Sequence, residues 1–157
     1  MHDVDIEVVL LSLRAGTELG WRLARGSLPG GCAPDARARE LAGLGARVPA
    51  ATVVHSTSWR PTPAGLVLTY AVLPDPDPAA GLVRAVPREA RLAYSTDPAA
   101  PTPAVIEVEH VLAHALRHLS LLARSDPVVA SAADAYPQLW HAVLTHTPEV
   151  AGQLVPT

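Results

Sequence analysis

Apolar runs separated by short polar interruptions divide the N-terminal half of the chain into strand-like segments. Residues 5–14, with IEVVLLSLR at their core, are β-branched and leucine-rich, which is typical of a buried strand. Residues 18–25 alternate partly between apolar and other side chains after a short turn, and this alternation predicts a hairpin partner. Residues 51–59 and 65–73 have the same character on either side of a proline-containing turn, so they predict a second hairpin.

Helical periodicity dominates the C-terminal half. Apolar side chains recur at spacings of three and four within residues 105–124, which predicts a long amphipathic helix. Its apolar face is expected to comprise Val105, Val108, Leu112, Ala115, Leu116, Leu119 and Leu122. Two shorter helices are expected to begin at Asp126-Pro127 and at Pro137, because proline is favoured in the first turn of a helix.

The segments between these elements contain the residues that interrupt regular structure. Residues 26–34 (GSLPGGCAP) are expected to form a loop because of their glycine and proline content. Asp35 is expected to cap a short helix that Gly45 ends. Residues 82–86 are expected to add a short strand, and the Pro-, Ala- and Asp-rich residues 87–103 a long loop.

Composition places the chain among ordinary globular proteins. At 157 residues it has the size of one typical domain, so we expect a single domain spanning residues 1–157. Its content of 49% hydrophobic and 17% charged residues argues against a disordered chain. Cys32 is the one cysteine, so it cannot form an internal disulfide, and we treat it as chemically incidental. Lysine, asparagine and phenylalanine are absent, which indicates a GC-rich genome.

Charge and hydropathy limit the partners that the chain is expected to bind. The net charge of −3 gives no electrostatic reason to expect binding to nucleic acid or to an anionic membrane. The first residues are acidic where a secretory signal peptide would be basic. No apolar run approaches the roughly 18 residues that a membrane span requires. We therefore expect a cytoplasmic protein that binds neither nucleic acid nor membrane.

Two short sequence motifs, together with this order of elements, resemble those of a known protein family. LPGG at residues 28–31 precedes the expected short helix, and RELAGLG at residues 39–45 lies within it. With the strand pair before them and the strand pair and long helix after them, they resemble the Nudix family over residues 5–124. The resemblance implies an α/β (α+β) fold, in which a mixed sheet is flanked by helices. Residues 125–157 are then a C-terminal helical extension.

The chain departs from that family at the residues that carry its activity. A Nudix box stacks several Glu carboxylates on one helix, where they hold Mg²⁺ against a diphosphate. Arg39 and Glu40 match the Arg-Glu step of the box, but Gly43 and Leu44 occupy the positions of its metal-binding Glu pair. One carboxylate cannot build that site, so hydrolysis of the Nudix type is not expected. Alternatively, RELAGLG is an ordinary amphipathic helix followed by a glycine stop.

Histidines form a ladder on the expected long helix. Glu107, His110, His114 and His118 follow one another at spacings of three, four and four, so they lie on one stripe, nearly opposite the leucine face. Two imidazoles four residues apart on a helix can chelate Zn²⁺, with Glu107 or the remaining histidine as third ligand. The alternative is a solvated polar face. We expect the second arrangement, with exposed and metal-free histidines.

Two further groups are candidate ligand-binding residues. His55 and Trp59 are expected to share one strand face with Thr57, where they would either line a pocket or simply pack. A serine–histidine–aspartate triad built from His55 and Asp75 is not expected, because the chain has no G-x-S-x-G turn.

Trp21, Arg22 and Arg25 precede the glycine-rich loop, and with it they could bind an anion or stack on a base. The alternative is a hairpin face with solvated arginines.

The sequence thus predicts a non-catalytic ligand- or partner-binding module on a degenerate Nudix-like scaffold. The alternative is a metal-dependent hydrolase of a nucleotide-type phosphoanhydride that uses a non-standard set of carboxylates and histidines. No cofactor is expected, and Mg²⁺ or Zn²⁺ belongs only to the alternatives. The partner is a small molecule or a protein, and the sequence leaves a homodimer open.

Overall fold

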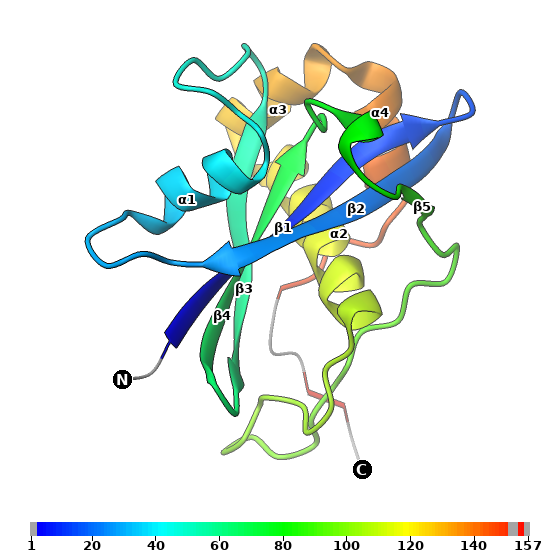
Figure 1. The fold of residues 1–157 in the computed structure, drawn as a ribbon. Coiled ribbons are helices and arrows are strands. Elements are labelled where there is room, and N and C mark those ends of the chain that lie inside the picture. Colours follow the sequence, from blue (N-terminus) through cyan, green and yellow to red (C-terminus); the bar gives the residue numbers. More distant parts are fainter. Residues whose placement is uncertain (1–2, 151–153, 156–157) are drawn as a thin grey trace.

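The computed structural model describes residues 3–150 and 154–155, and within them one five-stranded mixed sheet carries helices on both faces (Figure 1). The strands are β1 (Asp3–Arg14), β2 (Glu18–Ser27), β3 (Val53–Thr62), β4 (Gly65–Leu73) and β5 (Arg84–Ala85). The helices are α1 (Pro34–Leu41), α2 (Val108–Ser125), α3 (Pro127–Asp134) and α4 (Pro137–Leu144), with a 3-10 turn at Pro78–Ala80.

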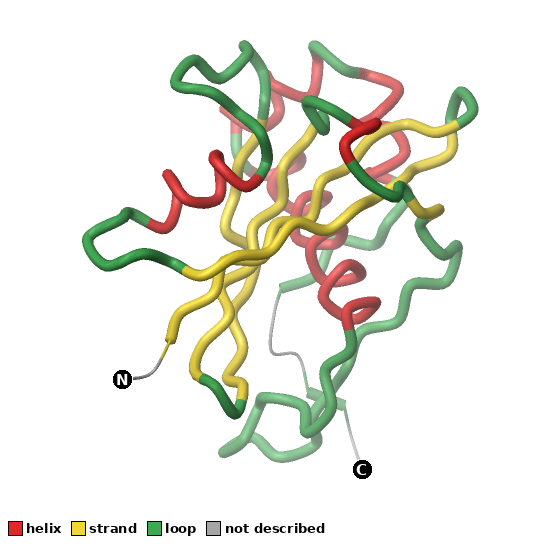
Figure 2. The backbone as a smooth tube through the Cα atoms, in the orientation of Figure 1, coloured by secondary structure: helices red, strands yellow, loops and turns green. Residues whose placement is uncertain are grey.

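The strand order is β3-β4-β1-β2-β5. Strand β1 is parallel to β4 and antiparallel to β2, while β3 and β4 form an antiparallel hairpin. The predicted α+β class, the mixed sheet and both hairpins are therefore confirmed. The segment predicted as a short strand contributes only the two residues of β5. Figure 2 shows that the connection from β5 to α2 is loop over its whole length.

Strand β1 lies at the centre of the sheet and is buried on both faces. Ile6, Val8 and Leu10 pack towards α1, whereas Val9 and Leu11 pack towards α2, α3 and α4. A strand covered on both faces needs apolar residues at every position rather than at alternate ones. This requirement explains the continuous apolar run from which the strand was predicted.

Helix α2 covers one face of the sheet through its leucines, as the periodicity predicted. Leu112, Leu116 and Leu119 are fully buried in the core on that face. Helices α3 and α4 extend the same core. Both short helices begin at the expected prolines, Pro127 and Pro137. Asp126 caps α3 by accepting two backbone N–H hydrogen bonds. No helix among the described residues is both long and apolar enough to cross a membrane.

Helix α2 begins three residues later than its periodicity suggested. Glu107 and His110 form a reciprocal cap, in which the Glu107 carboxylate accepts from the His110 backbone N–H and His110 Nδ1 accepts from the Glu107 backbone N–H at 3.1 Å. This cap fixes the first helical residue as Val108. Val105 therefore lies in the preceding loop and is exposed, not on the packed face of the helix.

Helix α1 differs from the prediction at both ends. Asp35 lies inside the first turn and does not cap the helix, because its carboxylate accepts a hydrogen bond from the Tyr70 hydroxyl of β4. Burial and this hydrogen bond raise the pKa of Tyr70 to about 12. The helix ends at Leu41, and Gly43 takes the left-handed conformation, with φ of 75°. Gly43, rather than Gly45, therefore allows the chain to turn away.

Replacing Leu112 with alanine should lower the free energy of unfolding by about 2–5 kcal/mol, because it leaves a cavity in the core beneath α2. Urea unfolding monitored by circular dichroism measures the loss. The control is Val128→Ala in α3, whose side chain is exposed, and this change should cost less than about 0.5 kcal/mol. Equal losses in the two variants would mean that α2 is not packed on the sheet through this leucine.

Candidate functional site

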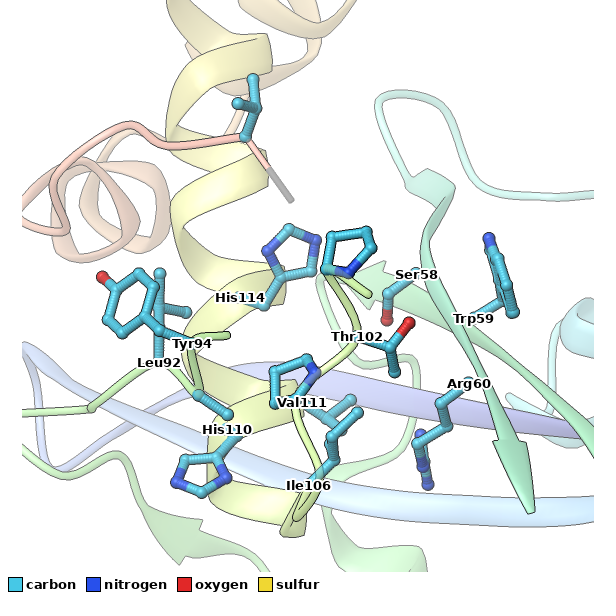
Figure 3. Close-up of a pocket in the computed structure, with 14 residues that line it drawn as sticks. Ser58, Trp59, Arg60, Leu92, Tyr94, Thr102, Ile106, His110, Val111 and His114 are labelled. Atoms are coloured by element: carbon cyan, nitrogen blue, oxygen red, sulfur yellow. The ribbon is translucent and has the colours of Figure 1, made fainter. Parts of the chain in front are cut away.

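A cavity of about 250 Å³ lies between β3, the first half of α2 and the loop that precedes α2 (Figure 3). Its apolar walls are contributed by Leu92, Pro101, Pro103, Ile106 and Val111. Small-molecule sites in proteins usually have apolar walls and a few polar groups, in volumes of about 300–1,000 Å³. The cavity is slightly smaller than that range, so it has room only for a compact ligand.

Strand β3 reaches the cavity with an irregular register. Ser56 pairs with Tyr70 and Ser58 pairs with Thr69, so Thr57 is an extra residue between two consecutive pairs. Such an insertion is a β-bulge, and it exchanges the two faces of the strand for every side chain that follows it.

The bulge contradicts the prediction that His55, Thr57 and Trp59 share one face of the strand. His55 precedes the bulge and lies against α2. After the bulge, Ser58 and Arg60 face the cavity, whereas Trp59, although it borders the cavity, extends its side chain on the other side of β3 and is 63% exposed (Figure 3). Strict alternation cannot predict this exchange, because His55 and Trp59 are four positions apart in the sequence whether or not a bulge lies between them.

Arg60, which lines the cavity, forms an ion pair with Glu7 of β1. Arg60 donates from Nη1 and Nη2 to the two carboxylate oxygens of Glu7 at 2.8 and 2.9 Å. Thr69 Oγ1 donates to the same carboxylate at 3.3 Å. Glu7 belongs to the central strand and is only 2% exposed, so this bidentate contact with Arg60 is what compensates its buried charge.

The histidine ladder meets β3 at the bulge. His114 Nε2 lies 3.0 Å from the backbone oxygen of Thr57, the inserted residue. A carbonyl oxygen only accepts, so His114 must carry a proton on Nε2 and donate it. In the uncharged imidazole, His114 Nδ1 then remains as a hydrogen-bond acceptor.

The prediction that the ladder is exposed is wrong. His110, His114 and His118 are all half-buried, because this flank of α2 packs against β3. The ring of His118 lies 5.3 Å from that of His55 and 6.0 Å from that of His114, measured between ring centroids. His118 Nε2 is buried and has no hydrogen-bond partner among the described residues.

Burial favours the uncharged forms of His114 and His118. It lowers the pKa of His114, although the hydrogen bond to Thr57 opposes the shift. Burial also lowers the pKa of His118, and the neighbouring imidazoles of His55 and His114 lower it further.

The ladder does not converge on a common point. Glu107 and His110 are engaged in the cap of α2, and His114 Nε2 is engaged by Thr57. Across residues 3–150 and 154–155, no three His, Cys, Asp or Glu side chains are arranged to hold a metal ion.

Trp21, Arg22 and Arg25 do not form a joint site. Trp21 is 4% exposed and belongs to the core beneath α2 and α4. Arg22 donates to both carboxylate oxygens of Asp75, at 2.6 and 2.8 Å, and Arg25 pairs with Asp5 at 3.0 Å. Adjacent residues of a strand point to opposite faces, which is why Trp21 and Arg22 are separated. Asp75 is therefore occupied by an arginine and not by a catalytic histidine.

The residues of the degenerate box lie along a shallow groove at the end of α1. Arg39, Glu40, Gly43 and Leu44 are among its lining residues. Glu40 is the one carboxylate among the described residues of the groove, is 68% exposed at its side chain and pairs with Arg37 at 2.7 Å. Mg²⁺ requires near-octahedral oxygen coordination. The residues of this groove do not fit the metal that the family resemblance implies.

The cavity contains residues that the sequence analysis missed. Arg60 and Thr102 line it, and Glu7 holds Arg60 in place through their ion pair. Glu7 had a signal in the sequence, since it is the one charged residue in the apolar run of residues 6–13. A carboxylate in a strand buried on both faces requires a partner of opposite charge. Thr102 had no such signal, because it lies in a loop defined only by its composition.

Comparison of the chain with protein-family models, with curated proteins and with solved structures found no match. The geometry of the cavity and of the groove is therefore the basis for a functional proposal.

Replacing Glu7 with glutamine should lower the free energy of unfolding by about 3–5 kcal/mol, because Arg60 is left without its counter-charge in a buried position. Urea unfolding at pH 7.5 measures the loss. The matched control is Asp5→Asn, which breaks the largely exposed pair with Arg25 and should cost less than about 1 kcal/mol. A loss of unfolding free energy below about 1 kcal/mol for Glu7→Gln would mean that the Glu7–Arg60 pair does not stabilise the fold beside the cavity.

Acidification should destabilise the contact between β3 and α2. Because burial lowers the pKa of His114 and His118, the unfolded chain binds protons more readily than the folded one as the pH falls below the ordinary histidine value of 6.5. Stability is therefore complete above that pH and decreases below it. His118→Gln should reduce the loss of unfolding free energy between pH 7.5 and 5.0, whereas His141→Gln, at an exposed position of α4, should not. An unchanged loss in His118→Gln would contradict this assignment.

Proposed function

We propose that this protein is a non-catalytic binding module that holds a small molecule in the cavity between β3 and α2. The observation that carries the proposal is the cavity itself, in which apolar walls surround a small set of polar groups from β3, α2 and the preceding loop. This arrangement is the usual construction of a small-molecule site. A cytoplasmic location is part of the same proposal.

A degenerate Nudix-like scaffold is also part of the proposal. The observed order of strand pair, glycine-containing loop, short helix, strand pair and long helix is compatible with it. The groove beside Glu40 lacks the carboxylates that the chemistry of that family requires, and the cavity lies on the opposite face of the sheet. A scaffold that has lost its metal ligands but has a separate cavity fits binding better than hydrolysis.

Filling the cavity should abolish binding. Ile106 is half-buried in the cavity wall, and its neighbour Val105 is 66% exposed. We expect saturation-transfer NMR with a library of metabolite-sized compounds to find ligands of the wild-type protein. These ligands should be lost in Ile106→Trp, where the larger ring occupies the cavity, and retained in Val105→Trp.

Two results would contradict the proposal. One is a library in which no compound binds, or in which the ligands bind Ile106→Trp unchanged. The other is hydrolysis of nucleoside triphosphates, dinucleoside polyphosphates or nucleotide sugars with Mg²⁺ or Mn²⁺, at more than about 0.1 s⁻¹. If Glu40→Gln abolished that turnover, the groove beside α1 would be a hydrolytic site and the alternative function would be correct.

A further inference from the structure

The charges around the cavity are balanced. Arg60 is the arginine among its described lining residues, and both of its terminal nitrogens are bound to the carboxylate of Glu7. Arg117 of α2 pairs with Glu149 at 2.7 Å, and the hydroxyl of the lining residue Tyr94 donates to the same carboxylate. Neither guanidinium is free to neutralise an anionic ligand, and neither carboxylate is free to neutralise a cation.

The two histidines of the cavity offer a ligand different hydrogen-bonding atoms. His110 Nδ1 accepts a hydrogen bond from the Glu107 backbone, so the proton of its ring is on Nε2. His114 donates from Nε2 to Thr57, so its Nδ1 is an acceptor. One imidazole therefore offers a donor and the other an acceptor.

Two further hydroxyl groups belong to the lining, besides that of Tyr94, which donates to Glu149. Ser58 comes from β3 and Thr102 from the loop, and Figure 3 shows both side chains within the group that lines the cavity. Neither hydroxyl has a hydrogen-bond partner among the described residues. A hydroxyl can donate to or accept from a ligand, so these groups suit an uncharged polar substituent.

We propose that the ligand of this cavity is an uncharged, largely apolar molecule of about the size of a substituted ring, which carries a hydroxyl or carbonyl group that Ser58 and Thr102 bind. The inference rests on the proposed function and specifies its ligand class. Phosphorylated and carboxylated compounds are excluded because a buried anion here would find no free counter-charge.

Three probes with the same ring and different head groups test the ligand class. These are 4-methylphenol, which is uncharged at pH 7.5, 4-methylbenzoate, which is anionic, and 4-methylbenzylammonium, which is cationic. Binding is followed through the backbone amide signals of Ser58, Thr102, Ile106 and Val111 in two-dimensional NMR spectra. We expect 4-methylphenol to bind at least tenfold more tightly than either charged probe, and inorganic phosphate to leave these signals unchanged.

A charge placed in the cavity should reverse the preference. Thr102→Lys introduces an unpaired cation at an exposed loop position, where the fold tolerates it, and should make 4-methylbenzoate the tightest of the three probes. Glu7→Gln should act in the same direction by releasing Arg60, provided that the variant is folded. Ser58→Ala should weaken 4-methylphenol by about three- to tenfold, the usual effect of one lost hydrogen bond.

The outcomes separate this inference from the proposed function. If the library compounds that are sensitive to Ile106→Trp are charged, or if a charged probe binds the wild-type protein as tightly as 4-methylphenol, the ligand class is wrong and the binding function stands. If neither the library nor any probe affects the cavity signals, the binding function itself is wrong.

Discussion

The buried carboxylate of Glu7 is the constraint on which the α2 side of the molecule depends. It lies in the central strand of a sheet covered on both faces, where an unpaired charge would be costly. Its counter-charge, Arg60, comes from the edge strand β3, two strands away across β4. Arg60 reaches it only because the bulge at Thr57 turns that part of β3 towards α2. One charged residue in an apolar strand thus requires an irregularity in another strand.

The same bulge explains why α2 carries histidines where it meets β3. The backbone oxygen of the inserted Thr57 faces α2, and His114 donates a hydrogen bond to it. An apolar side chain at position 114 would leave that oxygen without a donor. One turn further along, the ring of His118 lies beside that of His55, and its Nε2 is buried without a partner among the described residues. The leucines of α2 pack instead into the apolar core with Val9, Leu11 and Trp21. The cavity lies at the part of the α2 face where β3 and the first half of α2 contribute polar side chains.

The sequence was sufficient for the elements and the core, and insufficient for the site. Apolar periodicity located the strands and the buried leucines of α2, because burial on one face leaves a regular pattern. It misplaced the start of α2, since the cap between Glu107 and His110 depends on two specific side chains and not on period. It also placed Trp59 on the wrong face of β3, because the bulge shifts the alternation of side chains and no residue type in the strand indicates it. The spacing of the histidines on α2 was predicted correctly. Their burial was not, because it depends on which strand α2 packs against, and the sequence pattern of the helix does not specify that strand.

The two faces of the sheet therefore have different chemical capacities. On the α1 face, Glu40 is largely exposed and paired with Arg37, so the groove has neither the ligands nor the seclusion that metal-assisted phosphate chemistry needs. On the α2 face, the arginine that lines the cavity is paired with Glu7, and the other polar groups of the lining include hydroxyls and imidazoles. These groups can offer a ligand a defined shape and a few hydrogen bonds, which is the capacity that the proposed binding function requires.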